Sequence, residues 1–315
     1  MSMLRSIVFK RSSPLLTRIG VRHQSNIPFD TKPFPFQRFE PCCPDAAAAT
    51  ENGFVPCKSH PIPKVLGKKI ELTEDMVGPS SYRHMVICVG PDGLEWTRGK
   101  VETAKGGIME TLLGHLMEWI QAKKTKNDFT DLLPTVCERP SETAWPTSDI
   151  LVFPDFNRYP AVSPKNLKES PFWKVMDTLW MDCKVPKLPE IEHDKMEGVD
   201  AVILVCTHTQ RDKRCGVIGP MLVDEFRKSL KELGLDKKVE VWGTSHFGGH
   251  RFAGNVIIHQ RGLGGHMYGN VRQCHVRDLV DRHVVNGKVV REMWRGQVTP
   301  PTLENIESTE SAKST

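Results

Sequence analysis

Two cysteines and two histidines in the second half of the chain have residue types and a spacing that suit metal binding. Cys206 and Cys215 are separated by eight residues, and His246 and His250 enclose a Phe-Gly-Gly tripeptide. Two thiolates and two imidazoles form a full tetrahedral ligand set for zinc or for one iron of a cluster. The two glycines allow a tight fold between the histidines, and they disfavour a helical pair by ~2 kcal/mol.

The elements around these four residues are expected to bring them together. Apolar runs predict strands over residues 200–206 and 239–244, and Gly219-Pro220 and Gly234 mark the start and end of a helix between them. Loops at the carboxyl ends of neighbouring strands converge in α/β sheets, so the four side chains should meet at one edge. Cys215 would then lie shortly before the helix, which favours its thiolate form.

The remaining pattern predicts an α/β protein. A third strand at 255–259, a glycine-rich hairpin at 262–265 and a helix at 272–284 complete an order that is consistent with a thioredoxin-like sheet. The first half is looser, with strands at 84–90 and 149–153 and helices at 107–122 and 172–181; it could be a degenerate copy, although no sequence repeat is visible. We expect a leader (1–26), an N-terminal α/β region with a linker (27–194), a thioredoxin-like domain (195–301) and a disordered tail (302–315).

The spacing C-x8-C followed by H-x-G-G-H resembles the signature of the thioredoxin-like ferredoxins, also called the sucrase/ferredoxin-like family. All four ligand positions match, and the Trp-Arg-Gly-Gln-Val-Thr-Pro segment at 294–300 is similar to the C-terminal ending of that family. The resemblance implies a 2Fe-2S cluster with Cys206 and Cys215 on one iron and His246 and His250 on the other. It further implies a role in electron transfer, redox sensing or thiol homeostasis.

The first 29 residues carry five basic and no acidic side chains: Arg5, Lys10, Arg11, Arg18 and Arg22. This composition is typical of a mitochondrial transit peptide, the alternative being a basic N-terminus without a targeting role. With this leader the chain is most similar to the mitochondrial branch of the family, the "altered inheritance of mitochondria" proteins. We therefore expect a protein of the matrix or intermembrane space that meets the import and iron–sulfur assembly machineries and an unknown redox partner.

Charge and hydropathy exclude other classes of partner. The rest of the chain has equal numbers of basic and acidic residues, because the five leader charges account for the whole net charge of +5. The chain body therefore shows no bulk charge for nucleic acid. No apolar run approaches the ~18–20 residues that span a bilayer, so we expect no membrane insertion.

The other candidate groups are weaker. Cys42, Cys43 and Cys57 could form a redox or metal group or be inert, and His208 is interpreted as a loop residue near the site. The second Gly-Gly-His, ending at His266, is interpreted as a turn. The remaining cysteines are interpreted as structural thiols: Cys88, Cys137, Cys183 and Cys274.

Two other functions stay open at this point. Cys206 and Cys215 could cycle as the dithiol of an oxidoreductase, or the four ligands could hold zinc in a binding module without redox chemistry. No residue is assigned a catalytic role, and no hydrolase signature is present.

Overall fold

The computed structural model describes residues 27–30, 32, 65, 76, 78, 81–123 and 131–301. The predicted leader and tail and the Cys42, Cys43 and Cys57 group lie outside these residues. The described part is a mixed α/β structure around one ten-stranded sheet of order β10-β9-β8-β6-β7-β2-β1-β3-β4-β5.

The C-terminal half contains the predicted strand–helix–strand, hairpin and helix. Its elements are β6 (Ala201–Cys206), α4 (Lys213–Glu232), β7 (Val239–Thr244), β8 (Val256–Gln260), β9 (Gly264–Tyr268) and α5 (Gln273–Leu279), with a π-helical turn at Val280–Val285 and an edge strand β10 (Trp294–Thr299). β6 pairs parallel with β7 and antiparallel with β8, which pairs antiparallel with β9. This half therefore has the strand order β7-β6-β8-β9.

The N-terminal half repeats that arrangement. Its elements are β1 (Arg83–Cys88), α2 (Ile108–Lys123), β2 (Leu132–Cys137), β3 (Ser148–Phe153), β4 (Asn157–Val162), α3 (Phe172–Met181) and the short β5 (Asp194–Lys195). β1 pairs parallel with β2 and antiparallel with β3, and β3 pairs antiparallel with β4. The two halves thus share element order and strand order without a visible sequence repeat.

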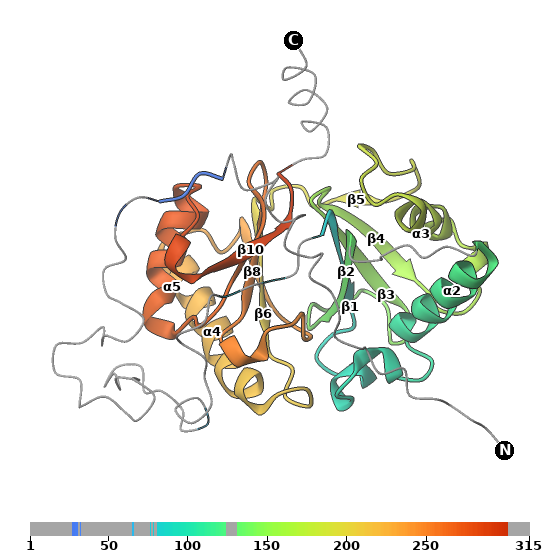
Figure 1. The fold of residues 1–315 in the computed structure, drawn as a ribbon, viewed down its shortest axis with the longest axis horizontal. Coiled ribbons are helices and arrows are strands. Elements are labelled where there is room, and N and C mark those ends of the chain that lie inside the picture. The colour runs from blue at the N-terminus through green and yellow to red at the C-terminus, as the bar shows by residue number, and fades with distance from the viewer. Residues whose placement is uncertain are drawn as a thin grey trace, which may run out of the picture.

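The halves meet at the carboxyl ends of β2 and β7. Cys137 pairs with Thr244 in antiparallel register, and the backbone N–H of Ser245 donates to the carbonyl of Val136 at 2.8 Å. Figure 1 shows α4 and α5 on the outer side of one half and α2 and α3 on the outer side of the other. The edge formed by the carboxyl ends of β6 and β7 therefore lies close to the junction between the halves.

Alternation along the strands explains how both faces of the N-terminal sheet are buried. Met85 and Ile87 of β1 join the core beneath α2 and α3, whereas Val86 and Cys88 join the core that the C-terminal half shares. Successive strand residues point to opposite faces, so both faces must be apolar. The halves are consequently one packed body across a shared core.

Candidate metal centre

The four predicted ligands lie at the carboxyl ends of β6 and β7, as the sequence predicts. Cys206 is the last residue of β6, and Cys215 is the third residue of α4. His246 follows β7 by two residues, and His250 opens a 3-10 turn that ends at Phe252.

The start of α4 differs from the prediction. The helix begins at Lys213, six residues before Gly219, because the carboxylate of Asp212 accepts the backbone N–H of Arg214 at 2.9 Å and caps the helix there. Cys215 is therefore inside the first turn rather than before the helix.

The two thiols interact directly. Cys206 and Cys215 are 2 % and 0 % exposed. The hydrogen bond from the Cys215 thiol, followed by one from His246, lowers the pKa of Cys206 to about 6 despite its burial. The same bond, together with burial, raises the pKa of Cys215 above its ordinary value. Within this pair the bond favours the thiolate form of Cys206 and the thiol form of Cys215, whereas the helix start would favour the thiolate of Cys215.

The two imidazoles complete a second pair. The ring centroids of His246 and His250 are 5.3 Å apart, and the Nδ1 atom of each ring is buried with no hydrogen-bond partner. Burial and then the neighbouring His246 lower the pKa of His250, so its ring stays neutral and keeps a free lone pair. A buried polar atom without a partner is costly, and a bound metal would satisfy it.

The glycines between the histidines are required by the turn. Gly248 and Gly249 have φ values of +95° and +67°, a backbone conformation that residues other than glycine rarely adopt. A Cβ on Gly249 would also lie 2.1 Å from the guanidinium of Arg295. The tight turn between the imidazoles therefore depends on glycine for conformation and for space.

Arg295 is a part of the site that the spacing of the ligands did not reveal. Arg295 is only 4 % exposed. Its Nη1 atom donates to Asn255 Oδ1 at 2.6 Å and to the carbonyl of Gly248 at 3.4 Å. Asn255 in turn donates to the carbonyl of Gly249 at 3.0 Å. Burial lowers the pKa of Arg295 to about 10, with the nearby Cys206 opposing that shift. The only sequence signal for this residue is its place in the family-like C-terminal segment.

The N-terminal half also reaches the site. His208 Nε2 donates to the carbonyl of Arg98 at 2.7 Å, and its ring meets Trp96 edge-on with centroids 5.8 Å apart. The backbone N–H of His208 donates to the sulfur of Cys206. The hydroxyl of Thr207, the residue between them, donates to Glu138 of the N-terminal half at 3.0 Å. His208 is thus a loop residue beside the site, and it ties the two halves together.

The donor set suits a metal group. Two thiols and two imidazoles can hold zinc at one point, or a 2Fe-2S cluster with two protein donors at each iron. Within the described part of the chain, no three His, Cys, Asp or Glu side chains are already gathered at one point.

The other histidines and cysteines in the described residues lie elsewhere. His266 is buried within β9, donates from Nε2 to Leu263 and accepts from Trp294, so it forms part of a strand rather than the predicted turn. His259 contacts His84 at 2.8 Å, across the core that the halves share.

None of the described helices is long and apolar enough to cross a membrane.

Comparison with known proteins places the chain in a family. The model of the sucrase/ferredoxin-like family matches residues 77–296. "Altered inheritance of mitochondria protein 32" of Debaryomyces hansenii is 43 % identical over 132 residues, which are 41 % of this chain and 45 % of that protein. "Actin patches distal protein 1" of Saccharomyces cerevisiae is 41 % identical over 69 residues, 19 % of this chain and 22 % of that protein.

A thioredoxin-like [2Fe-2S] ferredoxin from Aquifex aeolicus aligns in structure with 33 % of this chain and 96 % of its own, at 16 % identity and a TM-score of 0.27. The alignments with the two curated relatives cover less than half of each relative's length. The family match extends over more than two thirds of the chain and includes all four ligand positions. This chain therefore belongs to the sucrase/ferredoxin-like family.

Proposed function

We propose that the protein transfers single electrons through a 2Fe-2S cluster held by Cys206, Cys215, His246 and His250. The observation that carries this proposal is the meeting, at one sheet edge, of two hydrogen-bonded thiols and two imidazoles with partnerless buried nitrogens. When bound, such a cluster accepts and releases one electron. Redox sensing or thiol homeostasis would use the same electron transfer.

The cysteines and the histidines of the site would contribute differently to holding such a group. Cys206 supplies a thiolate near neutral pH, because its pKa is lowered to about 6. The buried cysteines exclude water from one side, whereas His246 and His250 are only half-buried. Neutral imidazoles leave the cluster less negative than four thiolates would, which raises its potential.

A mitochondrial location is part of the proposal. The relatives named for altered inheritance of mitochondria and the basic leader both support it. Import and iron–sulfur assembly machineries are then the expected partners during maturation.

A dithiol oxidoreductase is the second candidate. The lowered pKa of Cys206 beside the raised pKa of Cys215 resembles an attacking thiolate with a resolving thiol. Both sulfurs are nearly inaccessible, however, and attack on a substrate disulfide requires access. This burial favours the ligand role.

Metal and sulfide analysis of anaerobically purified protein tests the proposal. We expect two irons and two acid-labile sulfides per chain and a brown colour. His246→Ala should reduce the iron content sharply, and His193→Ala, on a half-buried histidine of the other half, should not. If the purified protein is colourless and contains one zinc per chain, it is a zinc-binding module instead. If it contains no metal and reduces disulfides, it is a dithiol oxidoreductase.

A further inference from the structure

The surface around the histidine edge of the site is strongly basic. Three segments border it, residues 98–102, 208–214 and 250–251, and we call their charged side chains the basic rim. The rim contains six basic residues and two acidic ones: Arg98, Lys100, Arg211, Lys213, Arg214 and Arg251, with Glu102 and Asp212. The chain beyond its first 29 residues has no net charge, so this excess is local.

Contacts hold the three segments next to one another. The carbonyl of Arg98 accepts from His208, and a Cβ on Gly99 would lie only 3.2 Å from the carbonyl oxygen of Gln210. Arg214 directly precedes Cys215 in α4, and Arg251 directly follows His250 in the 3-10 turn. The rim therefore borders the site, although its members are distant in sequence.

The rim is open to solvent where an electron would leave. Five of its basic side chains are exposed, and the sixth, on Arg214, is half-buried and paired with Asp212 at 2.8 Å. The histidines are half-buried while the cysteines are buried, so the imidazole side is the shorter route to the surface. Val217, 39 % exposed and two residues beyond Cys215, is the one large apolar side chain of this part of α4 that faces solvent among the described residues.

We propose that the basic rim is the docking surface for an acidic one-electron redox protein, a proposal that rests on the proposed function. Complementary charge raises the rate of encounter and orients the partner, and the exposed Val217 adds a small apolar contact on the same end of α4. In the transfer, the reduced partner loses one electron and the cluster gains it, or the reverse, and no bond is made or broken. An anionic membrane is less suitable, because Val217 is the one exposed large apolar side chain near the start of α4 in the described part of the chain.

Two small oxidants of opposite charge test the sign of the rim in the full chain. Dithionite-reduced protein gives one electron to hexacyanoferrate(III) or to tris(phenanthroline)cobalt(III), and stopped-flow absorbance follows the cluster. We expect the rate with the anionic oxidant to fall as salt increases and the rate with the cationic oxidant to rise. Poly-glutamate should slow the reaction with the anionic oxidant at low salt.

Charge reversal locates the effect. The variant Arg211→Glu, Lys213→Glu, Arg251→Glu should lower the rate with hexacyanoferrate(III) at least tenfold at low salt and remove its salt dependence. The matched control reverses three exposed lysines near the far end of α4, Lys228→Glu, Lys231→Glu and Lys237→Glu. Along the helix, Lys228 lies about 20 Å beyond Cys215, which is two Debye lengths at 0.1 M salt. At 0.1 M salt the control should keep the wild-type rate, whereas the rim variant should still be slower than wild type.

Three outcomes would overturn the inference: equal effects of the two triple variants, salt-independent rates, or rim-dependent binding to phosphatidylserine vesicles without an effect of poly-glutamate. The failure of the proposed function is distinct, since protein without a visible cluster band gives no signal at all.

Discussion

The two halves of the molecule have the same element order and strand order, but among the residues that the structure describes, the candidate metal centre lies in the C-terminal half alone. In the C-terminal half the thiolate of Cys206 faces a second thiol and the two imidazoles at a half-open edge. In the N-terminal half, Cys88 and Cys137 end β1 and β2 with sulfurs 3.7 Å apart, and both are fully buried. Burial raises the pKa of Cys88.

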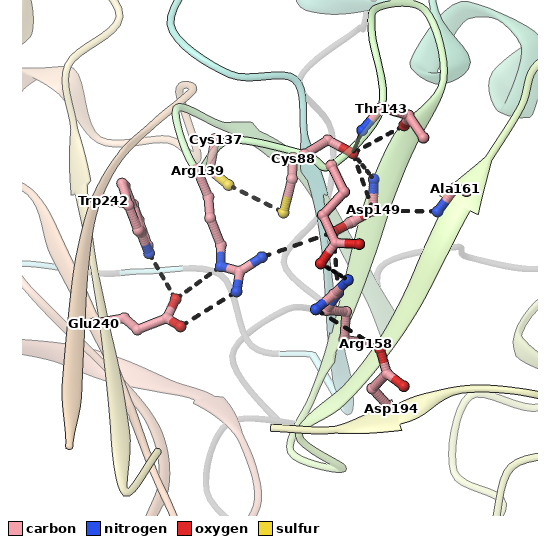
Figure 2. Close-up of polar contacts among 12 residues, drawn as sticks. Cys88, Cys137, Arg139, Thr143, Asp149, Arg158, Ala161, Asp194, Glu240 and Trp242 are labelled. Carbon is pink, nitrogen blue, oxygen red and sulfur yellow. Dashed lines mark hydrogen bonds and ion pairs between the residues drawn. The ribbon is translucent and has the colours of Figure 1, made fainter. Parts of the chain in front are cut away.

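Figure 2 shows what lies beside these two buried thiols. Arg139 donates to Glu240 at 2.9 Å and lies 3.9 Å from Asp149, which pairs with Arg158 at 3.0 Å. Glu240 also accepts from the indole of Trp242 at 2.7 Å. The N-terminal half therefore uses the ends of its strands for structural ion pairs, and the loops rather than the fold decide where chemistry takes place.

Replacing one cysteine in each half gives the largest expected contrast. Cys206→Ala should abolish iron binding, because it removes the thiolate ligand and leaves no side-chain oxygen that could replace it, whereas Cys88→Ser should keep the iron and lose about 1–3 kcal/mol of unfolding free energy. Iron analysis and urea unfolding measure the two effects. Equal iron content in both variants would show that Cys206 is not a ligand.

Alkylation of the metal-free protein sharpens the same comparison. Burial should make the modification of Cys206 by iodoacetamide slow, but its rate should increase with pH around an apparent pKa near 6, and Cys88 should remain a thiol throughout that range. Peptide mass mapping separates the two sites. Modification of Cys88 ahead of Cys206 at pH 7 would contradict the assignment of the thiolate.

Two glycines with almost the same backbone angle provide a matched pair. Gly249→Ala should cost roughly 2–4 kcal/mol and lower iron content, because φ is +67° and the new Cβ meets Arg295. Gly234→Ala, at φ +68° with open space around it, should cost only ~1 kcal/mol. Thermal unfolding and iron analysis measure the two effects. A similar loss of stability and iron in both variants would show that the contact between residue 249 and Arg295 has no special role.

Buried histidines in both halves should make the whole body sensitive to acid. Burial lowers the pKa of His84 and His275 to about 3 and that of His266 to about 4. The unfolded chain binds these protons near pH 6.5, so stability is full above that pH and is lost as pH falls from about 6.5 toward 4.

Each such histidine contributes about 1.4 kcal/mol per pH unit within that window. Urea unfolding at intervals between pH 7 and 5 measures the slope. His84→Gln should reduce the slope by one proton, and an unchanged slope would mean that His84 is already protonated in the folded state.

Two arginines provide the smallest contrast: Arg295, which is buried, and Arg139, which is half-buried. Arg295→Met should lower the reduction potential by roughly 60 mV, a tenfold change in equilibrium, because reduction adds a negative charge near this cation. Arg295→Lys should restore most of the potential. Arg139→Met should leave the potential unchanged and affect stability, since Arg139 is paired in the other network. Voltammetry measures the reduction potentials of the three variants and of the wild type. If all four potentials are equal, Arg295 has only a structural role.

Local patterns were enough to predict many elements. The amphipathic run over residues 172–181 and the apolar run over residues 239–244 gave the bounds of α3 and β7 as the structure has them. The four ligand candidates are within 45 residues, so their spacing was also visible. These predictions depend on neighbours along the chain.

Long-range contacts account for what the sequence did not reveal. The sequence analysis started the helix at Gly219, whereas α4 begins at Lys213 and contains two glycines that are needed for close packing: a Cβ on Gly216 would lie 2.1 Å from Thr209, and one on Gly219 would lie 2.3 Å from the carbonyl of Cys206. The carbonyl of Arg98 and the guanidinium of Arg295 reach the site from opposite parts of the chain. β2 was missed because Pro134 interrupts its apolar run, and β10 because its sequence is largely polar.

The most direct test of the central claim is pulsed electron paramagnetic resonance of the dithionite-reduced protein labelled with ¹⁵N-histidine. The account predicts a signal from one unpaired electron with strong coupling to two histidine nitrogens, and a weaker set of couplings in His250→Cys protein that retains a cluster. The His193→Ala protein should give the wild-type spectrum. A reduced cluster without histidine nitrogen coupling would contradict the assignment of His246 and His250.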